Sequence, residues 1–335
     1  MILIAGSANL DFVVRATHIP APGETVLGHS FQTFPGGKGA NQAVACARAG
    51  GAATSMLLAL GDDAFAAPLV DSLTQVHVTL HTVRIAEQPT GTAFICVSAD
   101  GENAITVAPG ANDCLAAAHL PPLVGVSHLL MQLETPVPTV LAYAQAAKAA
   151  GVQVVLNAAP APAQALPAEL LALVDILIVN KGELAAIVAA QYSKAAAQHN
   201  TAPDPIAPLG LQDQLAQLNV PCVVVTLGGA GCVARVKHAA TGDTSSDTSS
   251  DTNSEASSGA GSHMMVQAAY KIDVVDTTAA GDTFCGVLVA ALSQGSPMAD
   301  ALQTASAAAA LTCTKMGAQS SIPQQDAVKR FMLLA

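Results

Sequence analysis

Short, nearly continuous apolar runs alternate with longer Ala- and Leu-rich segments along most of the chain. The apolar runs have the length of strands and are rich in Val, Ile and Leu; they occupy residues 2–6, 127–132, 152–157, 175–180 and 222–227. The segments between them include residues 137–150, 166–173 and 181–190, which are long enough for helices. Apolar strands separated by helices predict an α/β protein whose mostly parallel central sheet is covered by helices on both faces.

Two segments, residues 12–34 and 90–108, break this alternation. Their polar and apolar residues alternate as in strands, without helical spacing, and they contain turn signals at Pro22-Gly23 and Asp100-Gly101. We expect these segments to form a small second β-sheet inserted into the main fold. A compact sheet hinged to the main body would be placed to act as a lid.

A third segment, residues 239–262, is rich in Ser, Thr, Asp and Gly and has no aromatic residue. Such a composition cannot bury enough apolar surface to fold, so it predicts a disordered insertion, either a passive solvated loop or a regulatory one. Residues 192–209 resemble a milder loop of the same kind. Strand patterns resume after both segments, and we therefore expect a single domain that spans residues 1–335.

Composition and charge narrow the class of ligand. Of the 335 residues, 51% are hydrophobic and 11% are charged, which is typical of a packed globular protein. The net charge is −11, and the 13 Lys and Arg residues are not clustered in any segment. Because binding to nucleic acids or anionic membranes needs clustered cations, we expect neither partner and favour small-molecule ligands.

The N-terminal residues and the cysteines bear on localisation. The opening MILIAG is apolar but shorter than the core of a signal peptide, and no apolar run reaches the ~18 residues of a membrane span. The seven cysteines are odd in number, scattered and without a C-x-x-C pair, which favours reduced thiols over a disulfide framework. These features predict a cytoplasmic protein.

Polar residues follow several of the predicted strands at the point where each strand ends: Asn9 and Asp11, Glu134, Asn157, Asn180 and Glu183, and Thr226 with Gly228. Ligands of open parallel α/β sheets bind beyond the carboxyl ends of the strands, so these side chains are expected to converge on one crevice. The alternative is that polar residues end strands simply because loops are solvated. The repetition of the pattern favours the crevice.

The segment PGGKGANQA, residues 35–43, places three glycines around Lys38 and then starts a helix that carries Asn41. Glycine lets the backbone approach a ligand closely, and Lys38 and Asn41 are able to donate hydrogen bonds to hydroxyl or phosphate oxygens. The spacing matches neither G-x-x-x-x-G-K-[ST] nor G-x-G-x-x-G. The alternative is a tight strand-to-helix turn without a ligand.

The segment DTTAAGDTFCGVLVAAL, residues 276–292, gives a stronger signal. The first amides of a helix lack intrahelical partners, so Ala280, Gly281 and Asp282 offer N–H groups to an anion, and Gly281 adds no side chain. The carboxylate of Asp282 beside an anion is favourable when a hydroxyl lies between them, giving its proton to Asp282 while its oxygen attacks a phosphoryl group. The alternative is that Asp282 is merely a helix-favouring acid in the first turn.

Together these motifs resemble those of the ribokinase-like carbohydrate kinase family over essentially the whole chain. The shared motifs, in the order of the family, are GSANLD, PGETV, GGKGANQA, MQLETP, NAAPA, LPAELLALVDI, VDTTAAGDTF and GAQSSIP. The resemblance implies a three-layer α/β fold with a small β-sheet lid, and ATP-dependent transfer of the γ-phosphoryl group to O5 of D-ribose. Because a small sheet with an exposed edge tends to pair, we also expect a homodimer through the lid.

The resemblance further implies roles for individual residues. Asp282 would be the base, with Ala280 and Gly281 in the anion hole. The sugar would be held by Asn9, Asp11, Gly37, Lys38, Gly39, Asn41, Glu134 and Asp282. The nucleotide would be held by Asn180, Thr226, Leu227, Gly228, Gly229, Ala230, Gly231, Gly281 and Ser306, with magnesium at Glu183. A potassium-like ion would take oxygens, largely backbone carbonyls, from Asp276, Thr278, Thr312, Lys315, Gly317 and Ser321.

Several substrates compete within this interpretation. Carboxylates at Asp11, Glu134 and Asp282 suit a neutral polyol, and no motif contains the arginine that a sugar acid would need. With three Tyr, seven Phe and no Trp, the chain has few aromatic residues to stack on a nucleoside base. Ribose is therefore favoured. The alternatives are another sugar or nucleoside kinase, acting on deoxyribose or adenosine, and a non-catalytic sugar-binding regulator, which would be expected to have lost Gly281 or Asp282.

Three departures from the family pattern bear on finer properties. The NKGE segment lacks the acidic-rich spacer common in the family, but it keeps Asn180 and Glu183. Cys285 stands where the family usually has asparagine and is either a small buried residue or, in the first turn of a helix, a redox-sensitive thiol. Ser306 stands where a larger polar residue often approaches adenine, so base selectivity stays open.

Overall fold

The computed structural model describes residues 1–198, 210–237 and 261–334, which form an α/β structure with two β-sheets. The main sheet has nine strands in the order β13-β12-β11-β10-β9-β8-β1-β4-β5. Its strands are β1 (Ile2–Ala5), β4 (Thr54–Gly61), β5 (Thr79–Ile85), β8 (His128–Met131), β9 (Gln153–Asn157), β10 (Ile176–Asn180), β11 (Cys222–Thr226), β12 (Cys232–Lys237) and β13 (Ser262–Gln267). The strands from β5 to β11 run parallel, and β12 and β13 add an antiparallel edge. The predicted mostly parallel sheet is confirmed.

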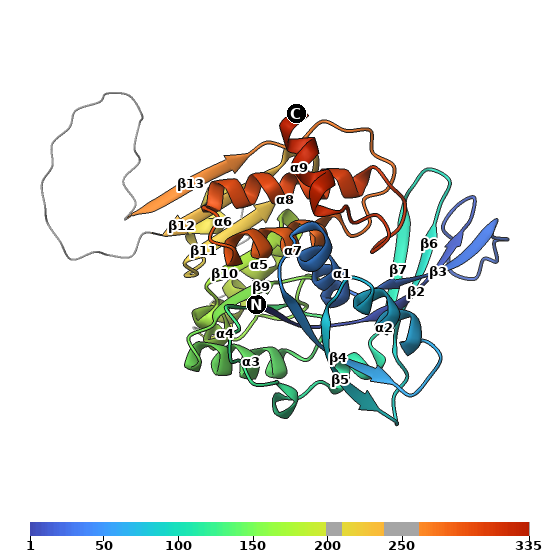
Figure 1. Cartoon of the computed structure of the whole chain (residues 1–335), viewed down its shortest axis with the longest axis horizontal. Helices are drawn as coiled ribbons and strands as arrows, with labels where there is room; N and C mark the ends of the chain where they lie inside the picture. The colour runs from blue at the N-terminus through green and yellow to red at the C-terminus, as the bar shows by residue number, and fades with distance from the viewer. Residues whose placement is uncertain (199–209, 238–260, 335) are drawn as a thin grey trace, which may run out of the picture.

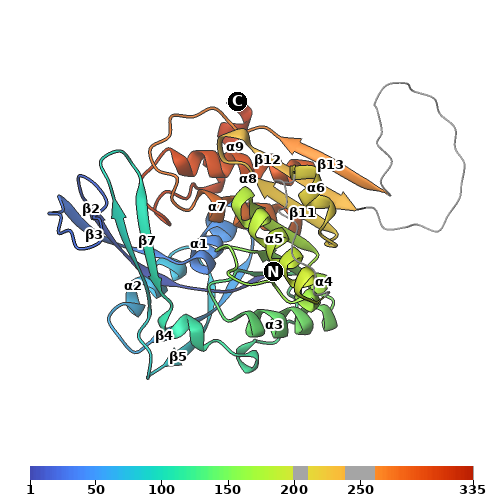
Figure 2. The same cartoon turned by 180° about the vertical axis from the view of Figure 1, so that it is seen from behind.

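Helices cover both faces of this sheet, which explains why its strands are apolar on both sides. One core lies between the sheet and α1 (Lys38–Val44), α2 (Ala66–Thr74), α7 (Ala280–Ser293), α8 (Met298–Cys313) and α9 (Gln325–Leu334). The second core lies between the other face and α3 (Val137–Ala149), α4 (Ala168–Leu173), α5 (Lys181–Gln198) and α6 (Leu211–Ala216). Figures 1 and 2 show the helices of the two layers from opposite sides of the molecule.

The small sheet has four strands in the order β3-β2-β6-β7: β2 (Asn9–Arg15), β3 (Ser30–Gly36), β6 (Gly91–Val97) and β7 (Asn103–Ala108). It projects from one side of the main body (Figures 1 and 2). The turn between β6 and β7 contains Gly101 with a φ of 90°, at one of the predicted turn signals. The second sheet predicted from residues 12–34 and 90–108 is confirmed, with strands that begin and end within a few residues of those bounds.

One face of the small sheet carries an aromatic cluster. The ring of Phe12 stacks on those of Phe31 and Phe94, with centroids 6.0 and 5.4 Å away, and meets Phe65 edge to face at 5.4 Å. Phe31 is 60% exposed and Phe94 is 55% exposed. The small sheet therefore presents apolar surface to solvent, in contrast to inner strands of the main sheet such as β1, β4 and β8, which are buried throughout.

One prediction from the sequence is partly wrong, and parts of two predictions fall on residues that the structure does not describe. α5 continues to Gln198, so the predicted loop at residues 192–209 is wrong for residues 192–198. The Ala-rich sequence there has high helix propensity and contains no Gly or Pro. Residues 199–209 lie outside the described residues, as does the predicted insertion at 239–262 except for Gly261, in a turn, and Ser262, which begins β13.

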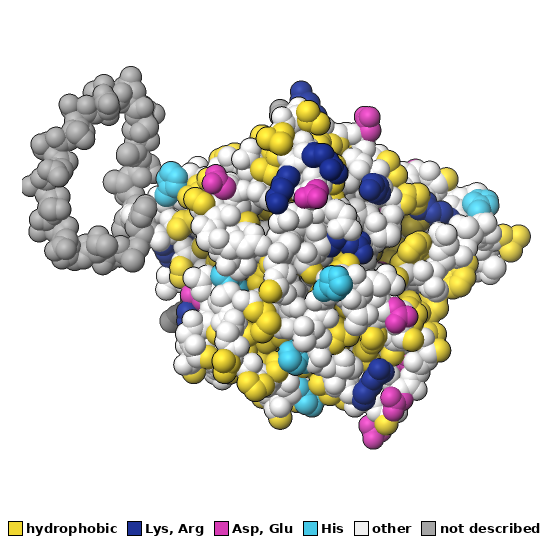
Figure 3. Space-filling view, viewed as in Figure 1, with side chains coloured by type: hydrophobic (Ala, Val, Ile, Leu, Met, Phe, Trp, Pro, Cys, Tyr) yellow, Lys and Arg dark blue, Asp and Glu magenta, His cyan; other side chains and the backbone are white. Residues whose placement is uncertain are grey.

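The cysteines, the helices and the charged surface bear on the properties considered from composition. All seven cysteines are free. Within the described ranges, no helix combines the length and apolar character that crossing a membrane requires. On the face shown in Figure 3, Lys and Arg side chains lie singly or in small groups, some of them beside Asp or Glu side chains.

Candidate active site

A cavity of about 170 Å³ lies where the polar residues at the ends of the parallel strands were expected to converge. Its lining comes from the starts of α1, α5 and α7 and from the ends of β9, β10 and β11: Lys38, Asn157, Ala159, Ile178, Val179, Asn180, Glu183, Thr226, Ala279, Gly281, Asp282 and Cys285. The structure thus gathers residues expected to bind sugar, nucleotide and metal around one space. Of the residues expected to converge there, Asn157, Asn180, Glu183 and Thr226 line the cavity, whereas Asn9, Asp11, Glu134 and Gly228 lie outside its lining.

The start of α7 presents free amides behind a residue in an unfavourable backbone conformation. Ala279 has a φ of 58°, in the left-handed region, which costs a non-glycine residue on the order of 1 kcal/mol. The Ala280 amide donates to the Thr277 carbonyl at 3.2 Å, whereas the Gly281 and Asp282 amides have no acceptor among the described residues. A Cβ added at Gly281 would meet nothing within 4 Å. This helix start is suited to hold an anion.

The carboxylate of Asp282 is held by two amide side chains of α1. Asn41 Nδ2 donates to Oδ2 at 2.9 Å, and Gln42 Nε2 donates to Oδ1 at 3.0 Å. Burial raises the pKa of Asp282, while the charge of Lys38 and the two amide donors act in the opposite direction. The arrangement provides an oriented carboxylate, with raised basicity, in the lining of the cavity.

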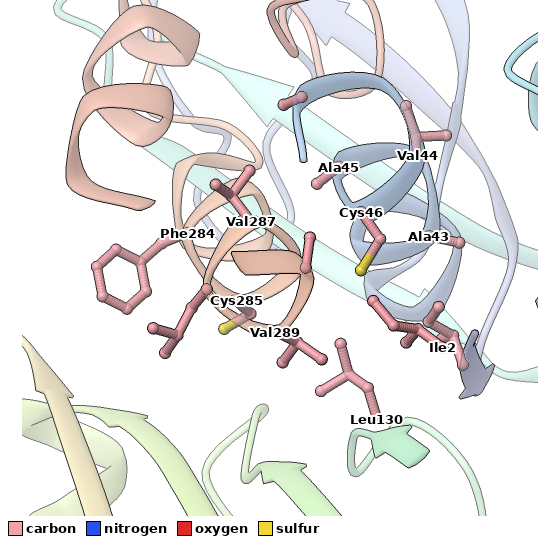
Figure 4. Close-up of a cluster of buried hydrophobic side chains, with 14 of the residues drawn as sticks. Ile2, Ala43, Val44, Ala45, Cys46, Leu130, Phe284, Cys285, Val287 and Val289 are labelled. Carbon is pink, nitrogen blue, oxygen red and sulfur yellow. The ribbon is translucent and has the colours of Figure 1, made fainter. Parts of the chain in front are cut away.

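Close packing between α1 and α7 places these amides. A Cβ at Gly286 would lie 2.6 Å from the Cβ of Ala45, so glycine is needed where α7 crosses the end of α1. The thiol of Cys46 donates to the Gly286 carbonyl at 3.1 Å. Figure 4 shows the two helical segments side by side, with Cys46 and Cys285 among the buried apolar groups. This contact holds the end of α1 against the second turn of α7 and so brings Asn41 and Gln42 near Asp282.

Carboxyl groups gather around Lys38 on the side of the small sheet. Burial, followed by the charges of Glu134 and Asp282, raises the pKa of Asp11 to about 7, while Lys38 acts to lower it. Burial alone would lower the pKa of Lys38, but Asp282, Glu134 and Glu183 together raise it. The result is a region rich in hydrogen-bond acceptors around a single ammonium group.

The glycines of residues 35–43 have a clear packing role. Gly37 precedes α1 with a φ of 86°, and a Cβ there would lie 2.7 Å from the Asn9 amide nitrogen. A Cβ at Gly39 would lie 2.7 Å from the Ser7 nitrogen. The resulting turn directs the Lys38 amide to Glu134 Oε2 at 3.1 Å. These glycines therefore make the tight turn proposed as the alternative, and the same turn positions two of the expected sugar-binding residues.

Asn9 is oriented by a residue that the sequence did not single out. Asn112 Nδ2 donates to Asn9 Oδ1 at 2.8 Å, and Asn112 Oδ1 accepts from the Ala8 amide at 3.0 Å. Asn112 lies in a short 3₁₀ turn and is buried. A single asparagine in a turn carries no sequence signal for such a contact, because turn asparagines usually bond their own backbone.

Asn180 and Glu183 form a reciprocal cap at the start of α5. The Asn180 amide donates to Glu183 Oε2 at 2.8 Å, and the Glu183 amide donates to Asn180 Oδ1 at 2.8 Å. Burial raises the pKa of Glu183, opposed by the Asn180 hydrogen bond and by Lys38. The second oxygen, Oε1, accepts from no described residue and leaves Glu183 able to meet a ligand in the cavity.

The segment from Thr226 to Gly231 forms a glycine-rich turn between β11 and β12. The Leu227 amide donates to the Gly231 carbonyl at 2.8 Å across the turn. A Cβ at Gly228 or Gly229 would meet nothing within 4 Å, so the backbone of the turn is open. Thr226 lines the cavity, whereas Ser306, on α8, is buried beside the Cys232 sulfur at 3.8 Å and lies outside that lining.

Part of the expected cation-binding set is brought together by Asp276. Its carboxylate accepts from the Thr278 hydroxyl at 2.7 Å and from the Gly317 amide at 2.9 Å. Burial would raise the pKa of Asp276, but these hydrogen bonds lower it overall. Thr312 accepts from the Lys315 amide at 3.2 Å, whereas the hydroxyl of Ser321 bonds within its own turn.

Besides Asn112, two features of the site went unassigned from the sequence: Gln42 and the conformation of Ala279. Gln42 lies inside the quoted motif, but its hydrogen bond to Asp282 depends on how α1 meets α7. The left-handed Ala279 has no sequence signal, because alanine rarely adopts that conformation.

Cys285 is 2% exposed, and burial with the neighbouring carboxylates raises its pKa well above the ordinary value. The buried interpretation is confirmed, and a reactive thiolate is not supported.

Comparisons with known proteins bear on the identity of this site. The model of the pfkB family of carbohydrate kinases matches residues 1–325. The chain is 32% identical to a ribokinase of Staphylococcus aureus over 98% of each protein. The crystal structure of a Thermotoga maritima ribokinase is similar, with a TM-score of 0.78 and 31% identity over 99% of both chains. An Arabidopsis thaliana ribokinase complexed with ribose and ATP gives a TM-score of 0.77 at 28% identity, over 99% of this chain and 98% of that one.

The family match covers nearly the whole chain, and the relatives match over almost their full length. Both sheets of the fold and the cavity at the strand ends lie within the matched residues. The chain therefore belongs to the pfkB family of carbohydrate kinases, which are phosphotransferases.

Proposed function

We propose that the protein is a ribokinase, which transfers the γ-phosphoryl group of ATP to O5 of D-ribose and releases ribose 5-phosphate. The observation that carries this proposal is the start of α7, where the Asp282 carboxylate stands beside two amides without acceptors in the lining of a cavity. A carboxylate next to an anion site is useful when an alcohol lies between them. The similarity to ribokinases, one of them complexed with ribose and ATP, supports the choice of substrates.

In this proposal the residues of the chain assist each part of the transfer. Asp282 takes the proton of the O5 hydroxyl as O5 bonds to the γ-phosphorus, and the bond from that phosphorus to the β-phosphate oxygen breaks to release ADP. The amides of Gly281 and Asp282, with Ala280 beside them, stabilise the charge on the transferring group. The raised pKa of Asp282 strengthens the base, while Asn41 and Gln42 favour its ionised form.

The proposed sugar site consists mainly of acceptors around Lys38. Asp11, Glu134 and Asp282 suit the hydroxyl donors of a neutral sugar and repel a substrate with its own carboxylate or phosphate. Asn9, Gly37, Gly39 and Asn41 complete the proposed set. A purine nucleoside would need an apolar surface for its base. The cavity lining combines Ala159, Ile178 and Val179 with polar side chains, so phosphoryl transfer to adenosine has to be compared with transfer to ribose.

The proposed nucleotide site comprises Asn180, Ser306 and the turn from Thr226 to Gly231. The open space at Gly228 and Gly229 gives a nucleotide access to the backbone there. Kinases hold magnesium with one or two carboxylates and the phosphate oxygens, and Glu183 fits this need with an unpaired oxygen in the cavity lining. When bound, magnesium supplies positive charge that offsets the phosphates.

A monovalent cation such as potassium fits the oxygen donors proposed near α7, because backbone carbonyls replace the hydration shell of such ions well. Asp276 already ties Thr278 to Gly317, so donors from separate segments lie close together. The proposed set is Asp276, Thr278, Thr312, Lys315, Gly317 and Ser321. When bound, the ion supplies positive charge close to the anion-binding start of α7.

We further propose that the small sheet is a lid over the sugar and that it mediates a homodimer. It carries Asn9 and Asp11 on β2, and its edge strands β3 and β7 each pair on one side only among the described residues. The exposed rings of Phe31 and Phe94 offer an apolar surface that a second copy would cover. The single-domain organisation of the chain is part of the same proposal.

The test is phosphoryl transfer from ATP to ribose, deoxyribose, fructose and adenosine, each with and without potassium. We expect ribose to give the highest kcat/KM, and Asp282→Asn to lower kcat with ribose by a factor on the order of 100 or more. Asp300→Asn is the matched control, because Asp300 is likewise an acid in the first turn of a helix, α8, but is exposed. Both changes remove a favourable interaction with a helix dipole, and only the first removes a base.

Near-normal turnover of Asp282→Asn would remove the base assignment. Equal losses in the Asp282 and Asp300 variants would support the interpretation of Asp282 as a first-turn acid. Preference for adenosine over ribose would redirect the proposal to a nucleoside kinase.

A further inference from the structure

A row of buried, hydrogen-bonded amide side chains runs from Asp282 into the main sheet. Gln42 Nε2 donates to Asp282 Oδ1 at 3.0 Å and to Asn157 Oδ1 at 2.9 Å. Gln132 Nε2 donates to Gln42 Oε1 at 2.6 Å. Gln42 and Gln132 are fully buried, and Asn157 is 7% exposed. Both N–H groups and the oxygen of the Gln42 amide are thus in use.

The neighbours of Gln42 in this row determine the orientation of its side-chain amide. A side-chain amide can turn by 180° and exchange its oxygen and nitrogen with little change in shape. Asn157 Nδ2 donates to the Ile178 carbonyl at 3.0 Å, and since that carbonyl can only accept, Asn157 presents its oxygen to Gln42. The ionised carboxylate of Asp282 can also only accept. Both neighbours therefore require the nitrogen of Gln42, and its oxygen is left for Gln132.

We infer that Gln42 is a positioning residue for the base, locked by Asn157 and Gln132 so that the Asp282 carboxylate keeps one orientation for proton transfer. Gln42 is absent from the cavity lining, so it acts through Asp282 rather than on the substrate. The inference rests on the proposed role of Asp282 as base. Asn41 holds the other carboxylate oxygen, and the two donors together oppose rotation of the carboxylate.

The same hydrogen bond affects the protonation of Asp282. Donation to the ionised form favours that form, so removing it should move proton uptake to higher pH. The other groups acting on Asp282 are Lys38 on α1 and Glu134 after β8, with Asp11 on β2, Glu183 on α5 and Cys285 on α7 itself. None of these changes when Gln42 is replaced by an uncharged residue of similar size, so the pH profile isolates the contribution of Gln42.

The experiment compares Gln42→Met with the native chain by steady-state kinetics, with ribose as the varied substrate, saturating ATP and pH 5.5 to 9. We expect kcat to fall by about 10- to 100-fold, the KM for ribose to change by less than about threefold, and the acid limb of kcat to move to higher pH. A kcat within about twofold of the native value and an unmoved acid limb would overturn the inference. So would a loss confined to KM.

Two further variants separate positioning from stability. Gln132→Met keeps Gln42 but frees its oxygen, and we expect a smaller shift of kcat and of the acid limb in the same direction; this variant also serves if Gln42→Met does not fold. Thr139→Val removes a buried 2.7 Å hydrogen bond on the opposite face of the sheet, and we expect only its unfolding temperature to fall. If Gln42→Met and Thr139→Val lose kcat equally, Gln42 has only a structural role.

Asp282→Asn in the same series distinguishes the two proposals. If its turnover is near normal, the base assignment fails, and the positioning role fails with it. If it is inactive while Gln42→Met is normal, only the inference about Gln42 fails.

Discussion

The two sheets of the molecule hold their carboxyl groups in different ways. Beside the main sheet, Asp282 accepts hydrogen bonds from Asn41 and Gln42, and Gln42 is itself locked by further buried amides. On the small sheet, Asp11 is 8% exposed, and its side-chain carboxyl accepts no hydrogen bond from a described residue. Under the proposed function, the group that takes the proton is oriented before substrate arrives, whereas the group that meets the sugar is left with unused acceptors.

The two sheets also differ in how deeply their strands are buried. Every residue of β4, which lies between β1 and β5 in the main sheet, is buried, whereas every residue of β7, at the edge of the small sheet, is exposed. Segments with few buried contacts open at lower free energy than core strands. The small sheet is therefore the part of the molecule better suited to move, and the main sheet is the part suited to hold the chemistry in place.

The largest expected effect concerns the start of α7, beside the main sheet. A Cβ at Gly281 would enter open space, so Gly281→Val should fold normally and place a side chain where the transferring phosphoryl group is proposed to lie. We expect kcat/KM to fall by roughly 100- to 1000-fold, similar to the loss of an anion-stabilising donor. The unfolding temperature should stay the same or rise slightly, because glycine in a helix is destabilising. Steady-state kinetics and thermal unfolding measure the two quantities.

Gly281→Ala is a milder substitution at the same position. Its smaller side chain should cause a smaller loss of kcat/KM with the same or greater stability. If both variants lose stability in proportion to activity, the open space at Gly281 is not a ligand site, and the start of α7 is only structural.

The sequence predicted the parts of the fold that depend on local pattern. Runs such as residues 175–180 become buried parallel strands because helices cover both faces of the sheet, and an apolar run is the expected sequence of such a strand. The equally apolar β4 was not singled out, since a short apolar run cannot be told from part of a helix by periodicity alone. The error at residues 192–198 came from reading polar residues as a loop where helix propensity decides.

The site was predictable to the extent that motif residues touch the cavity directly. Lys38, Asn180, Glu183, Thr226 and Asp282 all line it. Gln42 and Asn112 were missed because their contacts join segments about 240 and 100 residues apart in the chain. No local pattern encodes which face of α1 meets α7, and that choice follows from close packing at Gly286.

The next effect concerns the open face of the small sheet. If a second copy covers the aromatic cluster, Phe94→Ala should weaken the dimer, because a two-fold interface loses the buried ring twice. With a loss of about 1 kcal/mol per ring, the dissociation constant should rise by roughly 30-fold. Analytical ultracentrifugation over a range of concentrations measures it. Leu333→Ala is a matched control, since Leu333 is 86% exposed but lies on α9, away from this sheet. A native chain that is monomeric at all concentrations would contradict the proposed dimer.

The smallest expected effect concerns the unpaired carboxyl of Asp11. Its pKa is raised to about 7 in the folded chain, from an unfolded value near 3.8. The folded state therefore binds more protons between these values, so Asp11 lowers stability above pH 7, and this cost fades as pH falls toward 4. Asp11→Asn should be more stable than the native chain at pH 8, by on the order of 1 kcal/mol, and the difference should shrink by pH 5.

Chemical denaturation of both proteins at each pH, without substrate, measures this difference. Taking the difference removes the titration of groups that the two proteins share, although it includes the relief of Asp282, which interacts with Asp11. A difference that stays constant from pH 5 to pH 8 would show that Asp11 is satisfied in the folded chain. The contrast with the amide-held Asp282 would then be lost, because both carboxylates would be stabilised before any sugar binds.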